Sequence, residues 1–189
     1  MVLSLKEMLV IDLEATCWED RRPAGQTPEI IEIGLCRLDL ETLQPHEKTS
    51  ILVRPEQSEI SPFCTELTSI TPDMVAKDGI PFAEACSRLR KRFGAKTKPW
   101  ASYGNYDRLQ FERQCSQTEI PLPLSPTHLN IKTMVALHLQ LPREVGMKAA
   151  LQMLKIPLEG RHHRGDDDAW NTAKIAARLL ATLQKTQTP

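Results

Sequence analysis

The first part of the chain contains three segments in which aliphatic residues run together or alternate with polar ones, as they do in β-strands. Met8–Leu13 is a short apolar run that ends in acidic residues, which is typical of a buried strand. Ile30–Leu40 alternates and is rich in Ile and Leu, and Thr49–Arg54 predicts a third strand. We expect the stretch 46–54 to form a β-meander with its predecessor, and the polar residues 18–29 to form a loop.

After residue 80, apolar residues recur every three or four positions, which is the period of an amphipathic helix, and the first such helix runs from Phe82 to Phe93. Trp100–Tyr103 predicts a fourth short strand, and the prolines at 121, 123 and 126 predict a loop. Strands followed by helices with interspersed strands predict an α/β domain with a mixed sheet, whose inner strand order the pattern leaves open. Further helices are expected over residues 107–115, 131–141, 147–154 and 167–183.

Composition narrows the class of protein. The chain has 189 residues, 41% of them hydrophobic and 25% charged, which suits a single soluble domain over 1–189 with a polar tail at about 184–189. A domain of this size folds without a metal or disulfide staple. Basic and acidic residues number 24 each, so bulk charge does not attract nucleic acid, although a local basic groove still could.

The cysteines and the N-terminal residues indicate the cellular compartment in which the protein is expected. Five cysteines are scattered without a CxxC pair, which argues against a zinc ribbon or a disulfide framework and favours a reducing cytoplasm. Glu7 and Asp12 occur too early for the apolar core of a signal peptide, and no run of about 18 apolar residues exists. We therefore expect a cytoplasmic protein with no membrane association.

Two acidic groups follow predicted strands. Asp12 and Glu14 are two apart on the first strand and so share one face of it. Two carboxylates there repel each other unless a hard cation such as Mg²⁺ lies between them, although a solvated strand end also accommodates such a pair. Asn105–Asp107 follows the fourth strand, where these residues could equally form a turn and cap the next helix.

A third acidic group, His-His-Arg-Gly-Asp-Asp-Asp at 162–168, enters the last helix. The helix dipole and free N–H groups account for one or two aspartates, but three adjacent acids exceed what capping needs. Close like charges cost free energy unless a cation offsets them. Residues 63–71, Phe-Cys-Thr-Glu-Leu-Thr-Ser-Ile-Thr, predict a loop with hydroxyls and one aromatic. An N-capped helical turn at Thr71-Pro72-Asp73, with Phe63 in the core, is the alternative.

In their order along the chain, these motifs resemble the DEDDh family of 3′→5′ exonucleases over nearly the whole sequence. The residues that carry the resemblance are Asp12, Glu14, Asp107, His163 and Asp168. The flanking segments IDLEATCW, FCTELTSIT and HRGDDDAWNTAKIA are similar to the branch that includes the histone-mRNA and small-RNA trimming exonucleases.

Two positions depart from that branch: Tyr106 stands where it often has Trp, and Asp166 stands where the family usually has an apolar residue. The resemblance implies a ribonuclease H-like α/β fold, with a mixed five-stranded sheet flanked by helices. We do not expect the extra N-terminal nucleic-acid-binding module that some relatives have. It also implies digestion of single-stranded nucleic acid from the 3′ end to nucleoside 5′-monophosphates, with RNA favoured. A DNA-directed proofreading-type exonuclease and a non-catalytic RNA-end-binding scaffold are the alternatives.

The resemblance further implies two Mg²⁺ ions, for which Mn²⁺ can substitute. Asp12 would bridge both ions, Glu14 and Asp168 would complete the one that activates the nucleophile, and Asp107 would help to hold the second through water. His163 would be the general base, a role that suits a side chain whose pKa lies near neutrality.

His162 is a rival for that role, because His162-x4-Asp167 has the same spacing as His163-x4-Asp168. The family's His-Arg-Gly order selects His163 and Asp168.

Three further groups of residues are expected to bind the 3′ end of the nucleic acid. Phe63 and Tyr106 would sandwich the terminal base. Residues 66–68, namely Glu66, Leu67 and Thr68, would meet the terminal ribose, where a 2′-hydroxyl reports RNA. Arg164, with Arg161, would contact phosphate. A basic cluster at 88–98 fits a solvated helix face better than a nucleic-acid contact.

Overall fold

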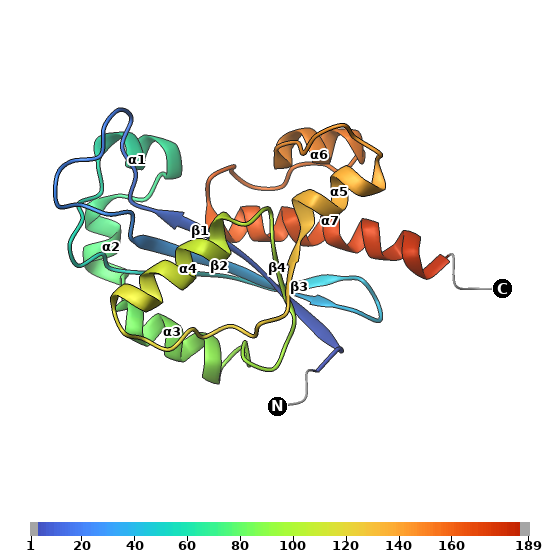
Figure 1. The fold of residues 1–189 in the computed structure, drawn as a ribbon, viewed down its shortest axis with the longest axis horizontal. Coiled ribbons are helices and arrows are strands. Elements are labelled where there is room, and N and C mark those ends of the chain that lie inside the picture. Colours follow the sequence, from blue (N-terminus) through green and yellow to red (C-terminus); the bar gives the residue numbers. More distant parts are fainter. Residues whose placement is uncertain (1–3, 186–189) are drawn as a thin grey trace.

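The computed structural model describes residues 4–185 and has a five-stranded mixed sheet in the order β3-β2-β1-β4-β5 (Figure 1). β1 (Glu7–Ala15) pairs antiparallel with β2 (Ile30–Asp39), and β2 pairs antiparallel with β3 (Pro45–Leu52). On the other side of β1, the strands β4 (Trp100–Ser102) and β5 (His128–Asn130) run parallel to it. The mixed five-stranded sheet implied by the resemblance is therefore confirmed.

Helices cover both faces of the sheet, and alternate residues of β1 belong to two separate cores. Leu9 and Ile11 lie in the core shared with the helices at 82–91 and 106–117, whereas Met8 and Val10 lie in the core shared with the helices at 131–138, 147–153 and 165–185. Burial on both faces explains why the first strand is a continuous apolar run. The helices are α1 (Pro62–Thr68), α2 (Pro72–Asp78), α3 (Phe82–Lys91), α4 (Tyr106–Gln117), α5 (Ile131–His138), α6 (Met147–Met153) and α7 (Gly165–Lys185).

The prediction of a loop over residues 63–71 is wrong, because α1 occupies most of it. Ser61 caps this helix by accepting a hydrogen bond from the Cys64 N–H at 3.0 Å, and Pro62 starts it. The helix ends at Thr68, and Ser69, which follows as its C-cap, has a left-handed φ of 61°. Short helices with few apolar positions give little periodicity, so the pattern did not locate α1. The N-capped turn weighed at Thr71-Pro72-Asp73 is present as the start of α2, where the Thr71 hydroxyl accepts a hydrogen bond from the Met74 N–H at 3.1 Å.

Strand ends also differ from the prediction. β3 covers residues 45–52 rather than 49–54, and the apolar pattern did not locate β5, which has only three residues. The helix predicted over 167–183 begins at Gly165 and continues to Lys185, and residues 186–189 of the predicted polar tail lie outside the described part of the chain. Among residues 4–185, no helix has both the length and the apolar character needed to cross a bilayer.

Candidate active site

Four acidic side chains meet where the carboxyl end of β1 lies beside the first turns of α4 and α7. Ligand atoms of Asp12, Glu14 and Asp168 all lie within 4.8 Å of one another. Asp107, in the first turn of α4, accepts a hydrogen bond from the Leu13 N–H at 2.8 Å, which fixes it against the same strand. The sheet topology thus brings together three segments that are far apart in the sequence.

Burial raises the pKa of every carboxyl in this group, and repulsion from neighbouring acids adds to the effect for Asp12, Glu14 and Asp107. Burial, followed by Asp168 and Glu32, raises the pKa of Glu14 to about 8, and burial raises that of Asp107 to about 6. The pKa of Asp12 is raised well above its usual value by burial and by Asp107 and Glu14, and burial also raises that of Asp168. Acids arranged in this way favour either protons or a bound cation.

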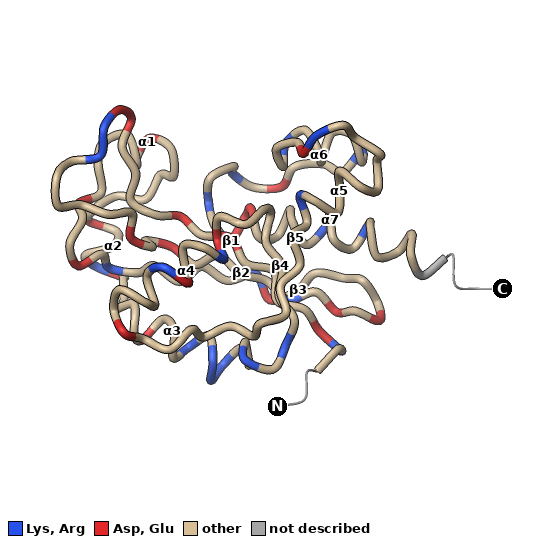
Figure 2. Tube along the Cα trace, viewed as in Figure 1, with Lys and Arg blue, Asp and Glu red and all other residues tan. Residues whose placement is uncertain are grey.

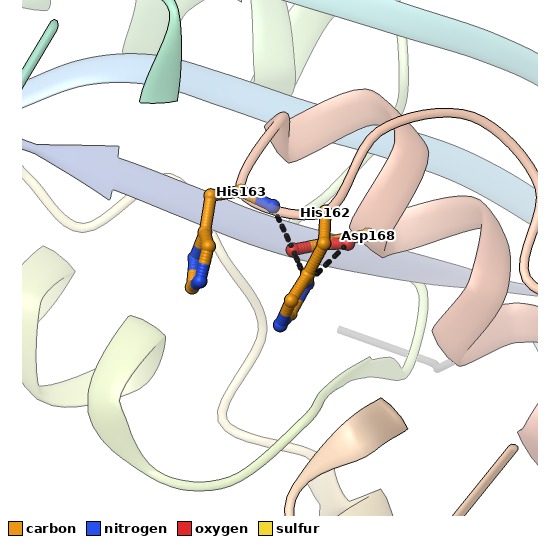
Figure 3. Close-up of side chains that lie close together, drawn as sticks. All are labelled: His162, His163 and Asp168. Carbon is orange, nitrogen blue, oxygen red and sulfur yellow. Dashed lines mark hydrogen bonds and ion pairs between the residues drawn. The ribbon is translucent and has the colours of Figure 1, made fainter. Parts of the chain in front are cut away.

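The two histidines stack beside Asp168, with ring centroids 4.0 Å apart (Figure 3). His162 approaches the carboxylate through Nδ1, at 3.1 and 2.9 Å from its two oxygens. His163 donates only its backbone N–H to Asp168, at 2.9 Å, and has a left-handed φ of 65°. In this structure the ring that touches Asp168 is therefore that of His162, while burial and the neighbouring His162 lower the pKa of His163.

The other two aspartates of the 162–168 motif face away from this cluster. Lys48 on β3 forms an ion pair with Asp167 and lies 3.6 Å from Asp166, measured from Nζ to Oδ2. Asp167 also accepts a hydrogen bond from the Arg161 N–H at 2.8 Å. Three adjacent acids are tolerated because Lys48 on β3 pairs with two of them, Asp166 and Asp167.

A pocket of about 330 Å³ opens over the acidic cluster. Besides the four acids and both histidines, its wall includes Leu67 from α1, Tyr106 from α4, Tyr103 from the end of β4 and Met147 from α6. The acids thus lie at the floor of a cavity whose sides are aromatic and apolar, an arrangement that can hold a planar ring next to a charged centre.

Comparison with known proteins agrees with this geometry. A model of the RNase_T family, described as exonuclease, matches residues 9–176. The chain belongs to this exonuclease family. Its relatives include 3′-5′ exoribonuclease 1 of Rattus norvegicus, 33% identical over 90% of this chain and 52% of that protein. The human protein of that name is 32% identical over 90% of this chain and 51% of its own length. The chain therefore spans about half the length of these curated relatives.

Solved structures of exonucleases place the chain in the DEDDh branch. The nuclease domain of 3′hExo, a DEDDh family member bound to rAMP, is 29% identical and superposes with a TM-score of 0.84, over 94% of this chain and 92% of that one. A 3′-exonuclease that recognises the 3′ end of the histone mRNA stem-loop gives 29% identity and a TM-score of 0.83, over 94% and 82% of the two chains. The resemblance to the histone-mRNA trimming branch is confirmed.

Of the residues predicted to bind the 3′ end, some line the pocket and others do not. Tyr106 is 55% exposed and lines the pocket with Leu67. Phe63 is half-buried one helical turn before Leu67 and is not among the pocket-lining residues. Thr68 is buried, and its hydroxyl donates to the Cys64 carbonyl at 2.8 Å. Glu66 is exposed, and its carbonyl accepts a 3.4 Å hydrogen bond from Arg161.

Arg164, predicted to contact phosphate, has a partner within the protein in this structure. Its Nη2 lies 3.0 Å from Oε1 of Glu32, a residue of β2 that is fully buried. Sequence reasoning assigned no role to Glu32, because a single acid within an apolar strand carries no motif of its own.

Tyr103 and Met147 were also missed as pocket residues. The Tyr103 hydroxyl donates to the Val145 carbonyl at 2.9 Å, which ties the end of β4 to the segment that leads into α6. A usable signal existed for Tyr103, since it directly follows a strand parallel to the one that bears the acids, and parallel strands end at the same edge of a sheet. Met147 gives no such signal.

The basic cluster at 88–98 lies away from the acids. Lys98 pairs with Glu7 at the opposite end of β1 from Glu14, at 2.8 Å, and Arg88 pairs with Glu84 at 2.7 Å. In Figure 2 the blue segments of this cluster follow α3 and the chain after it, along the lower side of the view. These pairings are those of a charged helix face in solvent.

Proposed function

We propose that this chain is one catalytic domain of a divalent-metal-dependent 3′→5′ exonuclease that prefers single-stranded RNA and releases nucleoside 5′-monophosphates. The observation that carries the proposal is the meeting of the Asp12, Glu14 and Asp168 ligand atoms within 4.8 Å. Carboxylate oxygens are hard donors of the kind that Mg²⁺ prefers, and burial and the neighbouring acids raise the pKa of Asp12 and Glu14, an effect that a bound cation would offset.

Asp12, Glu14 and Asp168, helped by Asp107, would hold two Mg²⁺ ions, and Mn²⁺ would substitute for them. When bound, such ions supply activation of water and neutralisation of the leaving oxygen's charge. The protein's part is to hold four acids from three segments at fixed positions and to exclude other ligands with the apolar walls of the pocket.

His163 would accept a proton from the attacking water through its imidazole. Its pKa is lowered by burial and by His162, so the ring is neutral near pH 7, which is the form that a base requires. The backbone hydrogen bond from His163 to Asp168 holds the residue next to the acids. The His162 ring already contacts the Asp168 carboxylate, and it would support the His163 ring by stacking on it.

The terminal base would stack on Tyr106 and pack against Leu67, with Tyr103 and Met147 on the remaining wall. Phe63, one turn from Leu67 on α1, would support that wall. RNA is favoured because related structures are described with rAMP and with a histone mRNA stem-loop. All five cysteines are free thiols, which supports a reducing compartment such as the cytoplasm.

The test is digestion of matched single-stranded RNA and DNA oligonucleotides with Mg²⁺ or Mn²⁺, with Asp12→Ala as the inactive control. We expect stepwise shortening of RNA from the 3′ end, nucleoside 5′-monophosphates as product, and no cutting of a circular strand. Faster digestion of DNA would favour the proofreading-type alternative. Tight RNA-end binding without any cleavage would favour a non-catalytic scaffold, and cleavage of the circle would exclude an exonuclease.

A further inference from the structure

Glu32 is the most completely buried acid outside the metal-binding cluster, with 0% of its surface exposed. Its carboxylate accepts four hydrogen bonds: from the Ser50 hydroxyl at 2.5 Å, from Arg164 Nη2 at 3.0 Å and Nε at 3.4 Å, and from the Gly165 N–H at 2.8 Å. Arg164 follows His162 and His163 in the loop that leads into α7, and Gly165 is the first residue of that helix. A carboxylate inside β2 therefore holds the first residues of that helix.

The register of the sheet places this attachment beside the acids of β1. Glu32 is the direct cross-strand partner of Glu14, and Gly34 is that of Asp12. The backbone of Gly165 lies so close to Gly34 that a Cβ at position 34 would come within 1.7 Å of the Gly165 carbonyl carbon. The start of α7 is thus pressed onto β2 directly opposite Asp12 and Glu14.

Two functional residues flank this point of attachment along the chain. Asp168 lies one helical turn after Gly165, and His163 directly precedes Arg164. A shift of the helix start relative to β2 would therefore move Asp168 away from Asp12 and Glu14, and would move His163 with it. Small misplacements of this kind lower reaction rates strongly.

We propose that Glu32 and Arg164 are a positioning pair, which fixes the distance of Asp168 and His163 from the acids of β1. Glu32 is fully buried and the Arg164 side chain is 24% exposed. An ion pair with a buried member is a poor means of gaining stability, since an apolar pair of similar volume usually does as well, and this favours a role in geometry. The inference rests on the proposed function, because the geometry matters through catalysis. It also replaces the prediction that Arg164 contacts phosphate with a structural partner for the same guanidinium.

The experiment compares Glu32→Gln, Arg164→Met and the double variant with the wild type. Arg178→Met is the matched control, because this arginine lies on the same helix and donates only to the Leu154 carbonyl, at 3.1 Å. For each protein the measurements are the melting temperature, kcat and KM on a single-stranded RNA, and the affinity for Mn²⁺ alone by calorimetry.

Each single variant should lower kcat by about 10-fold or more, with KM changed by less than about 3-fold. Each should also weaken Mn²⁺ binding, because Asp168 moves. Each single variant leaves a buried polar group without its partner, so its melting temperature should fall, and the double variant should regain most of that loss. The kcat of the double variant should nevertheless stay as low as that of the worse single one, and Arg178→Met should leave kcat unchanged.

Recovery of kcat together with the melting temperature would reduce the pair to a purely structural role. If Arg164→Met raises KM and changes its salt dependence, while Glu32→Gln does neither, Arg164 contacts phosphate and the proposal is overturned. If the wild type cleaves no RNA, the proposed function fails, but Mn²⁺ affinity still tests the pair, and unchanged affinity in all variants would then overturn it. If the single variants do not fold, the double variant carries the same comparison of kcat with stability.

Discussion

Two groups of carboxylates lie side by side at the start of α7, and they differ in what neutralises them. Within residues 4–185, no lysine or arginine forms an ion pair with Asp12 or Glu14, and the pKa of each is raised. The inner group is Asp12, Glu14, Asp107 and Asp168, and the outer group is Asp166 and Asp167, which pair with Lys48. Burial raises the pKa of Asp167, but the Arg161 N–H and Lys48 lower it by more, so that the pKa is lowered overall. Adjacent residues 167 and 168 are thus shifted in opposite directions. Missing positive charge, rather than acidity itself, marks the functional cluster.

The sharpest test of this contrast removes one acid from each group. Asp12→Ala should abolish turnover and weaken divalent-ion binding, because it removes the proposed shared ligand. Asp167→Asn should lower the melting temperature but leave turnover nearly unchanged. Steady-state rates with Mg²⁺ measure both. If Asp12→Ala retains more than about a tenth of the activity, a barrier change below about 1.4 kcal/mol, the metal assignment is wrong.

The histidines give the next largest effect. His163→Ala should slow turnover by about 10²–10⁴-fold while Mn²⁺ still binds, since the variant removes a base and no proposed ligand. His162→Ala should be mild, although its ring is the one that contacts Asp168 in the structure. Single-turnover rates of both variants decide between them, and a swapped result would make His162 the base.

Protons and metal should compete for the inner group. The pKa of Glu14 is about 8 in the fold against an ordinary value of 4.5, so the unfolded chain binds fewer protons between those values. The stability that this group contributes is therefore fully present below about pH 4.5 and is lost as pH rises to about 8 in metal-free protein. Melting temperatures with and without Mg²⁺ measure this, and Mg²⁺ should protect most at the alkaline end. Glu14→Gln should flatten the metal-free profile, and an unchanged slope would assign it to other groups.

Aromatic contacts should have a smaller effect, confined to the 3′ end. Tyr106→Ala should weaken binding of the terminal nucleotide by about 1–3 kcal/mol, and Tyr106→Trp should be tolerated because it keeps an aromatic face. Phe63→Ala tests the predicted sandwich from the other side. If Phe63→Ala lowers the melting temperature without altering end binding, Phe63 is a core residue and Leu67 alone faces the tyrosine.

The sequence predicted the acids of the site better than their surroundings. The resemblance to the DEDDh family selected Asp12, Glu14, Asp107 and Asp168, and the structure brings these four side chains together at one edge of the sheet. Spacing alone could not separate residues 166 to 168, since Lys48, the partner of Asp166 and Asp167, lies 119 residues from Asp167. Glu32 was missed for the same reason: its partners come from β3 and α7, and only pairing in three dimensions reveals them.

The smallest effect is expected from Lys48→Met, which removes the cation of the outer group. Asp166 and Asp167 would then repel each other, at a cost of about 1 kcal/mol, because the pair is partly exposed and the helix N-terminus still stabilises both charges. The melting temperature should fall by a few degrees and should partly recover in high salt, which screens the repulsion. Turnover should stay within about 3-fold of the wild type, since Asp168 keeps its own contacts with His162 and His163. A loss of turnover as large as that of His163→Ala would show that the two groups of carboxylates act as one.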